Sequence, residues 1–223
     1  MDRSFLPVCE PFLNGNERTY VLDALDTGWI SSAGKYIGEF EAAFASYVGA
    51  KHAIAVSNGT TALHLALVAM GIGKGDEVII PDFTMIASAF AVCYTGATPV
   101  FIDAERETWN IDPLQIEARI TPRTRAIMPV HIYGHPCAMD PIRAIAARHD
   151  IRILEDAAEV HGATYHGVKC GVLGDIAAFS FFANKVATTG EGGMVLTSDD
   201  DLARRCRYLE PLLPAGCFTR IPP

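Results

Sequence analysis

Three short segments carry side chains that could do chemistry, and each follows a run that is typical of a β-strand. The first is Ser-Asn-Gly-Thr-Thr at 57–61, and the second is Glu-Asp-Ala-Ala-Glu at 155–159. The third covers 179–185, ends in a lysine, and is followed by Gly-Glu-Gly-Gly at 190–193. Open α/β sheets bind ligands at the carboxyl ends of their strands. These segments are therefore candidates for one binding site.

The first segment could bind an anion. Gly59 permits close backbone approach, while the N–H groups and the positive dipole end of a following helix favour negative charge. The hydroxyls of Thr60 and Thr61 add hydrogen-bond donors. An ordinary helix cap has the same residue types, so this segment alone leaves phosphate binding and capping both open.

The other two segments offer a carboxylate and an amine. Asp156 ends an apolar run and could hold a cationic ligand atom, a metal or a ribose hydroxyl, or it could be a solvated acid. Lys185 also follows a largely apolar run. It is either an ordinary surface lysine or one that burial makes nucleophilic enough to attack a carbonyl.

Together the three segments supply what pyridoxal 5'-phosphate (PLP) requires of a protein. These requirements are an anion site for the phosphate, a carboxylate that keeps the pyridine nitrogen protonated, and a lysine for the covalent bond. The protonated ring is what makes this cofactor an electron sink. The residues therefore predict PLP as the cofactor.

The histidines and one loop leave alternatives. His131 and His135 have the spacing of a metal pair, but the Tyr-Gly pair between them favours a loop, so we expect no metal site. His161 and His166 either approach the ligand or form hydrogen bonds in the core, and we expect the core. Residues 29–34 form either a substrate-contacting loop or a turn between two helices.

Strand-like and helix-like segments alternate from about residue 50, which predicts an α/β fold with a mostly parallel central sheet flanked by helices. Apolar residues at helical spacing and a following glycine, for example, predict a helix over 60–70. The expected strands are 52–56, 77–80, 99–102, 126–130, 151–154, 177–182 and 194–197. The expected helices are 17–26, 36–48, 60–70, 84–94, 113–120, 141–148 and 201–208.

Composition narrows the class of protein. Half of the 223 residues are hydrophobic, which is enough for a substantial core. The 18 basic and 26 acidic residues give a net charge of −8, and the basic residues are dispersed, so we expect no nucleic-acid partner. No apolar run reaches membrane-spanning length, and the first residues lack the apolar core of a signal peptide, so we expect neither a membrane span nor an export signal. The six cysteines are widely spaced, so we expect reduced thiols in a cytoplasmic protein.

Four motifs, taken in order, resemble those of the DegT/DnrJ/EryC1/StrS family of sugar-nucleotide aminotransferases. They are Ser-Asn-Gly-Thr at 57–60, Pro-Asp-Phe-Thr at 81–84, Glu-Asp-Ala-Ala-Glu-Val-His-Gly at 155–162, and 180–185 with 190–193. The resemblance covers roughly residues 7–208. It implies the large domain of a fold type I PLP-dependent transferase.

The resemblance also implies roles for individual residues. Lys185 matches the lysine that binds PLP covalently and later moves protons. Asp156 matches the acid that pairs with the pyridine nitrogen. Gly59, Thr60 and Ser180 match residues that contact the phosphate.

Two positions differ from most members of the family. Glu159 stands where most members have Gln, near the phenolic oxygen of the cofactor, and Met85 stands where many have an aromatic ring that stacks on it. Glu159 and the sequence Phe-Phe-Ala-Asn-Lys at 181–185 most resemble the corresponding residues of members that aminate C4 of a GDP-linked 4-keto-6-deoxymannose. The resemblance thus implies conversion of a nucleotide-linked 4-keto-6-deoxy sugar to a 4-amino sugar for polysaccharide or glycan biosynthesis, with glutamate as amino donor.

We expect an N-terminal helical segment over 1–50, a PLP-binding large domain over 51–208, and an irregular tail over 209–223. Relatives continue into a smaller domain that the tail does not resemble, so we expect a chain shortened by a frameshift or an early stop. The alternative function is therefore an inactive PLP-binding or dimerising fragment. The resemblance further implies a homodimer with the active site at the interface.

Overall fold

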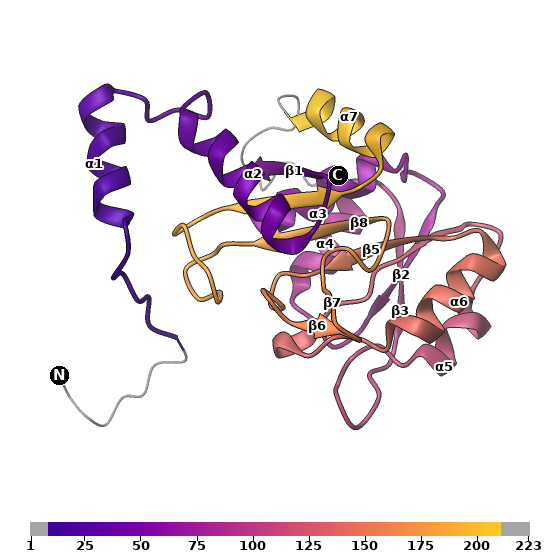
Figure 1. Cartoon of the computed structure of the whole chain (residues 1–223). Coiled ribbons are helices and arrows are strands. Elements are labelled where there is room, and N and C mark those ends of the chain that lie inside the picture. The colour runs from indigo at the N-terminus through magenta and orange to yellow at the C-terminus, as the bar shows by residue number, and fades with distance from the viewer. Residues whose placement is uncertain (1–8, 211–223) are drawn as a thin grey trace.

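The computed structural model describes residues 9–210, which fold around one seven-stranded sheet (Figure 1). The strands of this sheet are β1 (His52–Val56), β2 (Glu77–Pro81), β3 (Thr98–Ile102), β4 (Thr124–Ile127), β5 (Arg152–Asp156), β8 (Ile176–Ser180) and β9 (Gly193–Thr197). The α-helices are α1 (Glu17–Thr27), α2 (Lys35–Val48), α3 (Gly59–Ala69), α4 (Ile86–Tyr94), α5 (Pro113–Ile116), α6 (Met139–His149) and α7 (Asp200–Leu209). Over the described range, every helix is too short or too polar to cross a bilayer.

The sheet is mostly parallel, as predicted. Its strand order is β1-β9-β8-β5-β4-β2-β3, and the run from β8 to β3 is paired in parallel throughout. Strand β9 is antiparallel to both β8 and β1, so β1 points the same way as β8. The carboxyl ends of β1, β5 and β8 therefore lie at one edge of the sheet.

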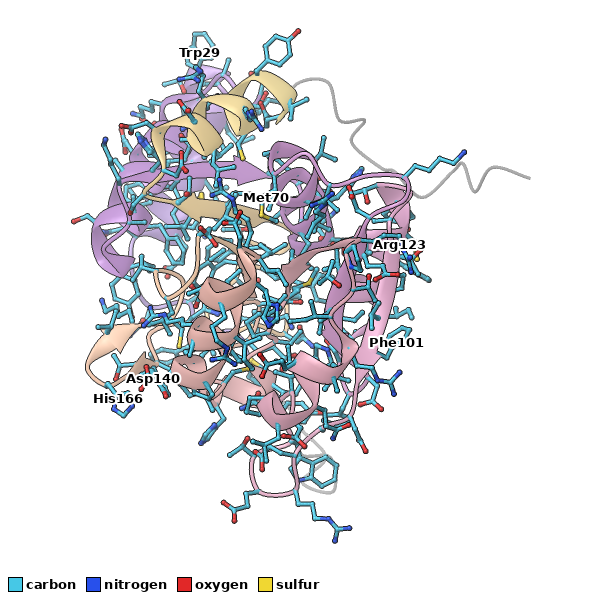
Figure 2. The ribbon with its side chains drawn as sticks, turned by 90° about the vertical axis from the view of Figure 1, so that its right-hand side faces the viewer. Trp29, Met70, Phe101, Arg123, Asp140 and His166 are labelled. Carbon is cyan, nitrogen blue, oxygen red and sulfur yellow. The ribbon has the colours of Figure 1, made fainter. Side chains whose placement is uncertain are left out.

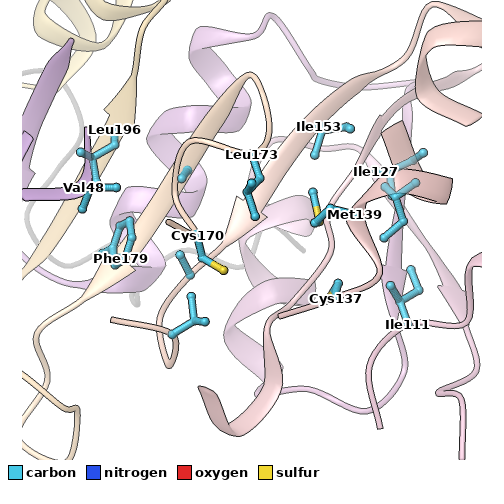
Figure 3. Close-up of a cluster of buried hydrophobic side chains, with 14 of the residues drawn as sticks. Val48, Ile111, Ile127, Cys137, Met139, Ile153, Cys170, Leu173, Phe179 and Leu196 are labelled. Carbon is cyan, nitrogen blue, oxygen red and sulfur yellow. The ribbon is translucent and has the colours of Figure 1, made fainter. Parts of the chain in front are cut away.

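Helices cover both faces of the sheet, because the strands are apolar on both sides. Side chains alternate along β5, so Ile153 joins the core under α2, α5 and α6 while Leu154 joins the core under α3, α4 and α7. Figure 3 shows the first of these clusters, which extends from Val48 and Leu196 to Ile127. Two buried cores thus hold the sheet edge in place.

Helix α1 contrasts with the other long helices, because none of its residues is buried. It stands apart from the sheet in Figure 1, whereas α2 packs on β1 and buries Phe44 and Val48. Residues 29–34 form the turn between these two helices, where the Gly34 N–H donates to the Ser31 carbonyl.

Several predicted boundaries were wrong in detail. Helix α4 begins at Ile86 rather than at 84, because Met85 is extended. The strand expected over 126–130 is β4 (Thr124–Ile127), and Val130 makes only an isolated bridge to β5. The helix expected over 113–120 ends as a 3-10 turn, Glu117–Arg119. Of the predicted tail, residue 209 belongs to helix α7 and Glu210 caps it, and 211–223 lie outside the described residues.

A small hairpin was not predicted, and it corrects one histidine. Strands β6 (Thr164–Tyr165) and β7 (Val168–Lys169) are antiparallel, and His166 occupies their turn with a positive φ of 49°. His166 lies at the surface near Asp140, with 3.4 Å between Nε2 and Oδ2 (Figure 2). The prediction of a core position for His166 was wrong, because a left-handed turn residue with a charged neighbour stays in solvent.

The core makes a direct prediction about stability. Leu65 of α3 is fully buried, whereas Leu114 of α5 is almost fully exposed. We expect Leu65→Ala to lower the free energy of unfolding by about 2–5 kcal/mol, because it removes buried contacts and leaves a cavity. Leu114→Ala should change it by less than about 0.5 kcal/mol. Denaturant titration of both variants measures these free energies. Equal losses would contradict the placement of Leu65 in the core and Leu114 at the surface.

Candidate active site

Two glycines allow the ends of β1, β8 and β9 to meet closely. Gly193 pairs with Val56 on one side and Ser180 on the other, and a side chain there would overlap the carbonyl of Asn58. A Cβ on Gly59 would lie 2.7 Å from the Cβ of Ser180. The start of α3 and the end of β8 are therefore in direct contact, which places Gly59 beside the Ser180 hydroxyl.

The N-terminus of α3 is both capped and open to the site. Asn58 is its cap, and its Oδ1 accepts hydrogen bonds from the Thr61 backbone N–H at 2.9 Å and the Thr61 hydroxyl at 3.0 Å. The first N–H groups of a helix have no acceptor within it. Gly59 and Thr60, the first two residues of this helix, both line a cavity. Capping and anion binding are thus compatible in this segment.

Asp156 is a buried acid whose side chain faces α4. Its Oδ2 accepts a hydrogen bond from the Ser88 hydroxyl at 2.8 Å, and its Oδ1 accepts one from the Ala158 N–H at 3.2 Å. Burial raises the pKa of Asp156, while the bonds from Ser88 and Ala158 and the nearby Lys185 act to lower it. The alternative of a solvated acid at this position is excluded by its burial.

Glu155 faces the opposite side of β5 and is fully buried. Its carboxylate accepts three backbone N–H groups from residues 171–174, at 2.7 to 2.8 Å, and a bond of 3.1 Å from His131 Nε2. The Cys137 N–H donates to Nδ1 of His131, so His131 is neutral with its proton on Nε2. His131 is therefore a core histidine with both ring nitrogens bonded.

Lys185 reaches the site from the loop after β8. Its Nζ donates to Glu159 Oε1 at 3.0 Å, and Glu159 Oε2 accepts the Tyr133 N–H at 2.9 Å. The Lys185 side chain is only 13 % exposed. This burial favours the nucleophilic alternative over an ordinary surface lysine, and Glu159 holds the amine in place.

All seven predicted site residues line one cavity of about 340 Å³, which is within the size range of small-molecule sites. They are Gly59, Thr60, Met85, Asp156, Glu159, Ser180 and Lys185. The cavity thus combines anion donors, a buried carboxylate and an amine. This donor set fits PLP, because it can bind a phosphate, pair with a ring nitrogen and bond covalently to a carbonyl carbon.

Met85 lines this cavity, whereas the neighbouring Phe83 does not. Phe83 turns toward a second group of rings, with centroid distances of 5.2 Å to Trp109 and 6.3 Å to Tyr133. Trp109 and Tyr133 both have positive φ angles. The thioether of Met85 can pack on a π-face.

The sequence motifs contain further cavity residues to which the sequence analysis assigned no role. Thr84, Asn184 and Glu191 also line the cavity, and Ser88 lies behind Asp156. The only available signal for Ser88 was its spacing of four from Thr84, whose hydroxyl lies 3.0 Å from that of Ser88. A serine in an alanine-rich helix does not reveal its partner, so the structure was needed to find it.

His161 corrects another prediction. Its ring packs against Phe44, Phe179 and Phe181, with centroid distances of 5.3 to 6.4 Å. Within the described part of the chain, both of its ring nitrogens are buried without a hydrogen-bond partner, so the expected core hydrogen bond is absent. Burial lowers the pKa of His161 to about 4. The histidine is therefore neutral near pH 7.

Comparison with known proteins places the chain among aminotransferases. The model of the DegT/DnrJ/EryC1/StrS aminotransferase family matches residues 11–212. GDP-perosamine synthase from Caulobacter vibrioides is 63 % identical over 204 residues, which are 92 % of this chain and 55 % of that protein. GDP-perosamine synthase from Escherichia coli O157:H7 is 52 % identical, over 92 % of this chain and 57 % of that protein.

A solved structure agrees with these relatives in fold. The PLP form of a sugar aminotransferase from Streptococcus pneumoniae superposes with a TM-score of 0.86 at 31 % identity, over 92 % of this chain and 57 % of that one. The chain spans about half the length of the curated relatives it matches. Because the family model covers most of the chain and the fold matches, this chain belongs to the DegT/DnrJ/EryC1/StrS aminotransferase family.

Proposed function

We propose that this chain is a PLP-dependent aminotransferase that converts a nucleotide-linked 4-keto-6-deoxy sugar to a 4-amino sugar, with glutamate as amino donor. The observation that carries the proposal is the convergence of Lys185, Asp156 and the start of α3 on one cavity. Similarity to GDP-perosamine synthases supports GDP-4-keto-6-deoxymannose as the substrate and polysaccharide or glycan biosynthesis as the setting.

Five residues would hold the cofactor. The N–H groups at the start of α3 and the hydroxyls of Thr60 and Ser180 would bind its phosphate, since Gly59 lets the helix approach Ser180. Asp156 would pair with its ring nitrogen, and Lys185 would bond to it covalently. When bound, PLP supplies the electron sink through which an amino group moves from an amino acid to a keto sugar.

Lys185 and Glu159 would manage the protons. A lysine attacks a carbonyl carbon only as a neutral amine, so Lys185 Nζ would first pass a proton to an acceptor such as Glu159 Oε1, which is 3.0 Å away, and then move from it. Glu159 keeps its position during this movement because the Tyr133 N–H holds its other oxygen. When it is not bonded to the cofactor, the Lys185 amine would accept a proton from one carbon and return it to another.

We also propose how the chain divides. Residues 51–208 would form the cofactor-binding domain, because they supply every residue that lines the cavity. Residues 1–50 would form an N-terminal helical segment, which the exposed helix α1 supports. The five cysteines in the described range are unpaired, which supports the proposed cytoplasmic location because that compartment keeps thiols reduced.

We further propose a homodimer, and the exposed face of α1 supports it. The helix has 11 residues, which is short for an isolated helix in water, and its large apolar side chains are exposed. We expect sedimentation to give a dimer and Leu25→Glu of α1 to shift it toward monomer. Val168→Glu, at an exposed position on β7, is the control and should remain dimeric. A monomeric parent chain would contradict the dimer.

The role of Lys185 can be tested by absorbance. We expect the chain to develop a visible band with PLP that reports the covalent bond, and Lys185→Ala to lack it. Lys74→Ala, which removes an exposed lysine, should keep the band. An unchanged band in Lys185→Ala would refute the assignment.

The reaction itself can be tested by turnover. We expect amino transfer from glutamate to GDP-4-keto-6-deoxymannose, and a loss of at least about a hundredfold in Lys185→Ala, because the proton-carrying amine is gone. Product formation is followed by chromatography of the nucleotide sugars. If the chain binds PLP without turnover, the alternative of a cofactor-binding protein without transaminase activity would replace the proposal.

A further inference from the structure

Ser88 is fully buried and is the third residue of α4, the helix that packs against the face of the sheet to which Asp156 points. Its hydroxyl donates to Asp156 Oδ2 at 2.8 Å, and the Thr84 hydroxyl lies 3.0 Å from it on the preceding turn. Thr84 lines the cavity. A chain of two hydroxyls therefore connects the cavity wall with the buried carboxylate.

The two oxygens of Asp156 are bonded to different parts of the structure. Oδ1 accepts the Ala158 N–H from its own strand end, whereas Oδ2 accepts from Ser88 on a helix that is 68 residues away in sequence. One bond leaves a carboxylate free to rotate, but two bonds from different directions fix its plane. Ser88 is therefore the contact that determines how this carboxylate presents itself to the cavity.

We propose that Ser88 is a positioning residue, whose hydroxyl fixes the orientation of the Asp156 carboxylate and keeps it ionised for a cationic ring nitrogen. The ring-nitrogen part rests on the function proposed above, whereas the link between Ser88 and Asp156 stands on the contacts alone. A hydroxyl that donates to a carboxylate stabilises the ionised form.

The charges around Asp156 identify what else can affect its ionisation. Burial raises the pKa of Asp156, and the Ser88 bond is the largest opposing contribution, followed by the Ala158 N–H and Lys185. His131 also lies nearby, but its Nδ1 accepts the Cys137 N–H, so it carries no positive charge in this arrangement. Glu155 and Glu159 are the neighbouring acids on β5 and in the segment after it. These groups are the same in parent and variants, so a difference between Ser88 variants reports the hydroxyl.

The first experiment needs no cofactor. Ser88→Ala, Asp156→Asn and the double variant are unfolded by denaturant from about pH 5 to about pH 8. Because the hydroxyl stabilises the ionised carboxylate, the loss of stability in Ser88→Ala should grow as pH rises. In the Asp156→Asn background, the loss of stability caused by Ser88→Ala should no longer depend on pH. A loss that is constant with pH and unchanged by Asp156→Asn would overturn the proposal, since simple packing would explain it.

The second experiment measures PLP affinity by equilibrium titration. We expect the Kd for PLP to rise about tenfold in Ser88→Ala, as for the loss of one hydrogen bond to a charged group. Ser88→Cys keeps the volume but is a weak donor, so it should behave like Ser88→Ala, and Ser88→Thr should restore affinity. Full affinity in Ser88→Cys would refute a role for the donor.

The two experiments separate this proposal from the function on which part of it rests. Suppose that the effect of Ser88→Ala on unfolding depends on Asp156, but the parent chain does not bind PLP. This result would support the positioning role and refute the proposed function. If the parent, Ser88→Ala and Ser88→Cys all bind PLP equally tightly, the result would refute the positioning role and support the proposed cofactor.

Discussion

A buried carboxylate at the end of a central strand is the constraint on which the rest of the site depends. Burial alone raises the pKa of Asp156, and an unpaired buried charge costs several kcal/mol, roughly speaking. Ser88 and the Ala158 N–H offset part of that cost. The first turn of α4 therefore lies against the end of β5, and both elements line the cavity.

Because side chains alternate along β5, its two consecutive acids point to opposite faces of the sheet and make different contacts. Glu155 points to the other face and binds the backbone of residues 171–174, which lead directly into β8. Strand β8 ends at Ser180, beside Gly59, and the loop after it carries Lys185 to Glu159. The acid that meets the cavity and the acid that anchors the next strand are thus adjacent in the sequence, so a single strand positions both sides of the site.

Sequence reasoning found the alternating elements and seven of the residues that line the cavity, because strand ends and glycine-rich turns have local signals. It failed where tertiary contacts decide. Ser88 has no local signal because its partner is on another element, and the hairpin turn at His166 is too short for a periodic pattern. Helix α4 starts later than predicted because Met85 is extended at the edge of the cavity.

The most direct test of the central claim is to identify the lysine that bonds to PLP. The chain is loaded with PLP, reduced with borohydride to make the bond permanent, digested and examined by mass spectrometry. Of the five lysines, the modification should be found on Lys185, the one that faces Asp156 and Glu159 within the cavity. Modification spread over the other lysines, with Lys185 unmodified, would contradict the assignment of this cavity as the cofactor site.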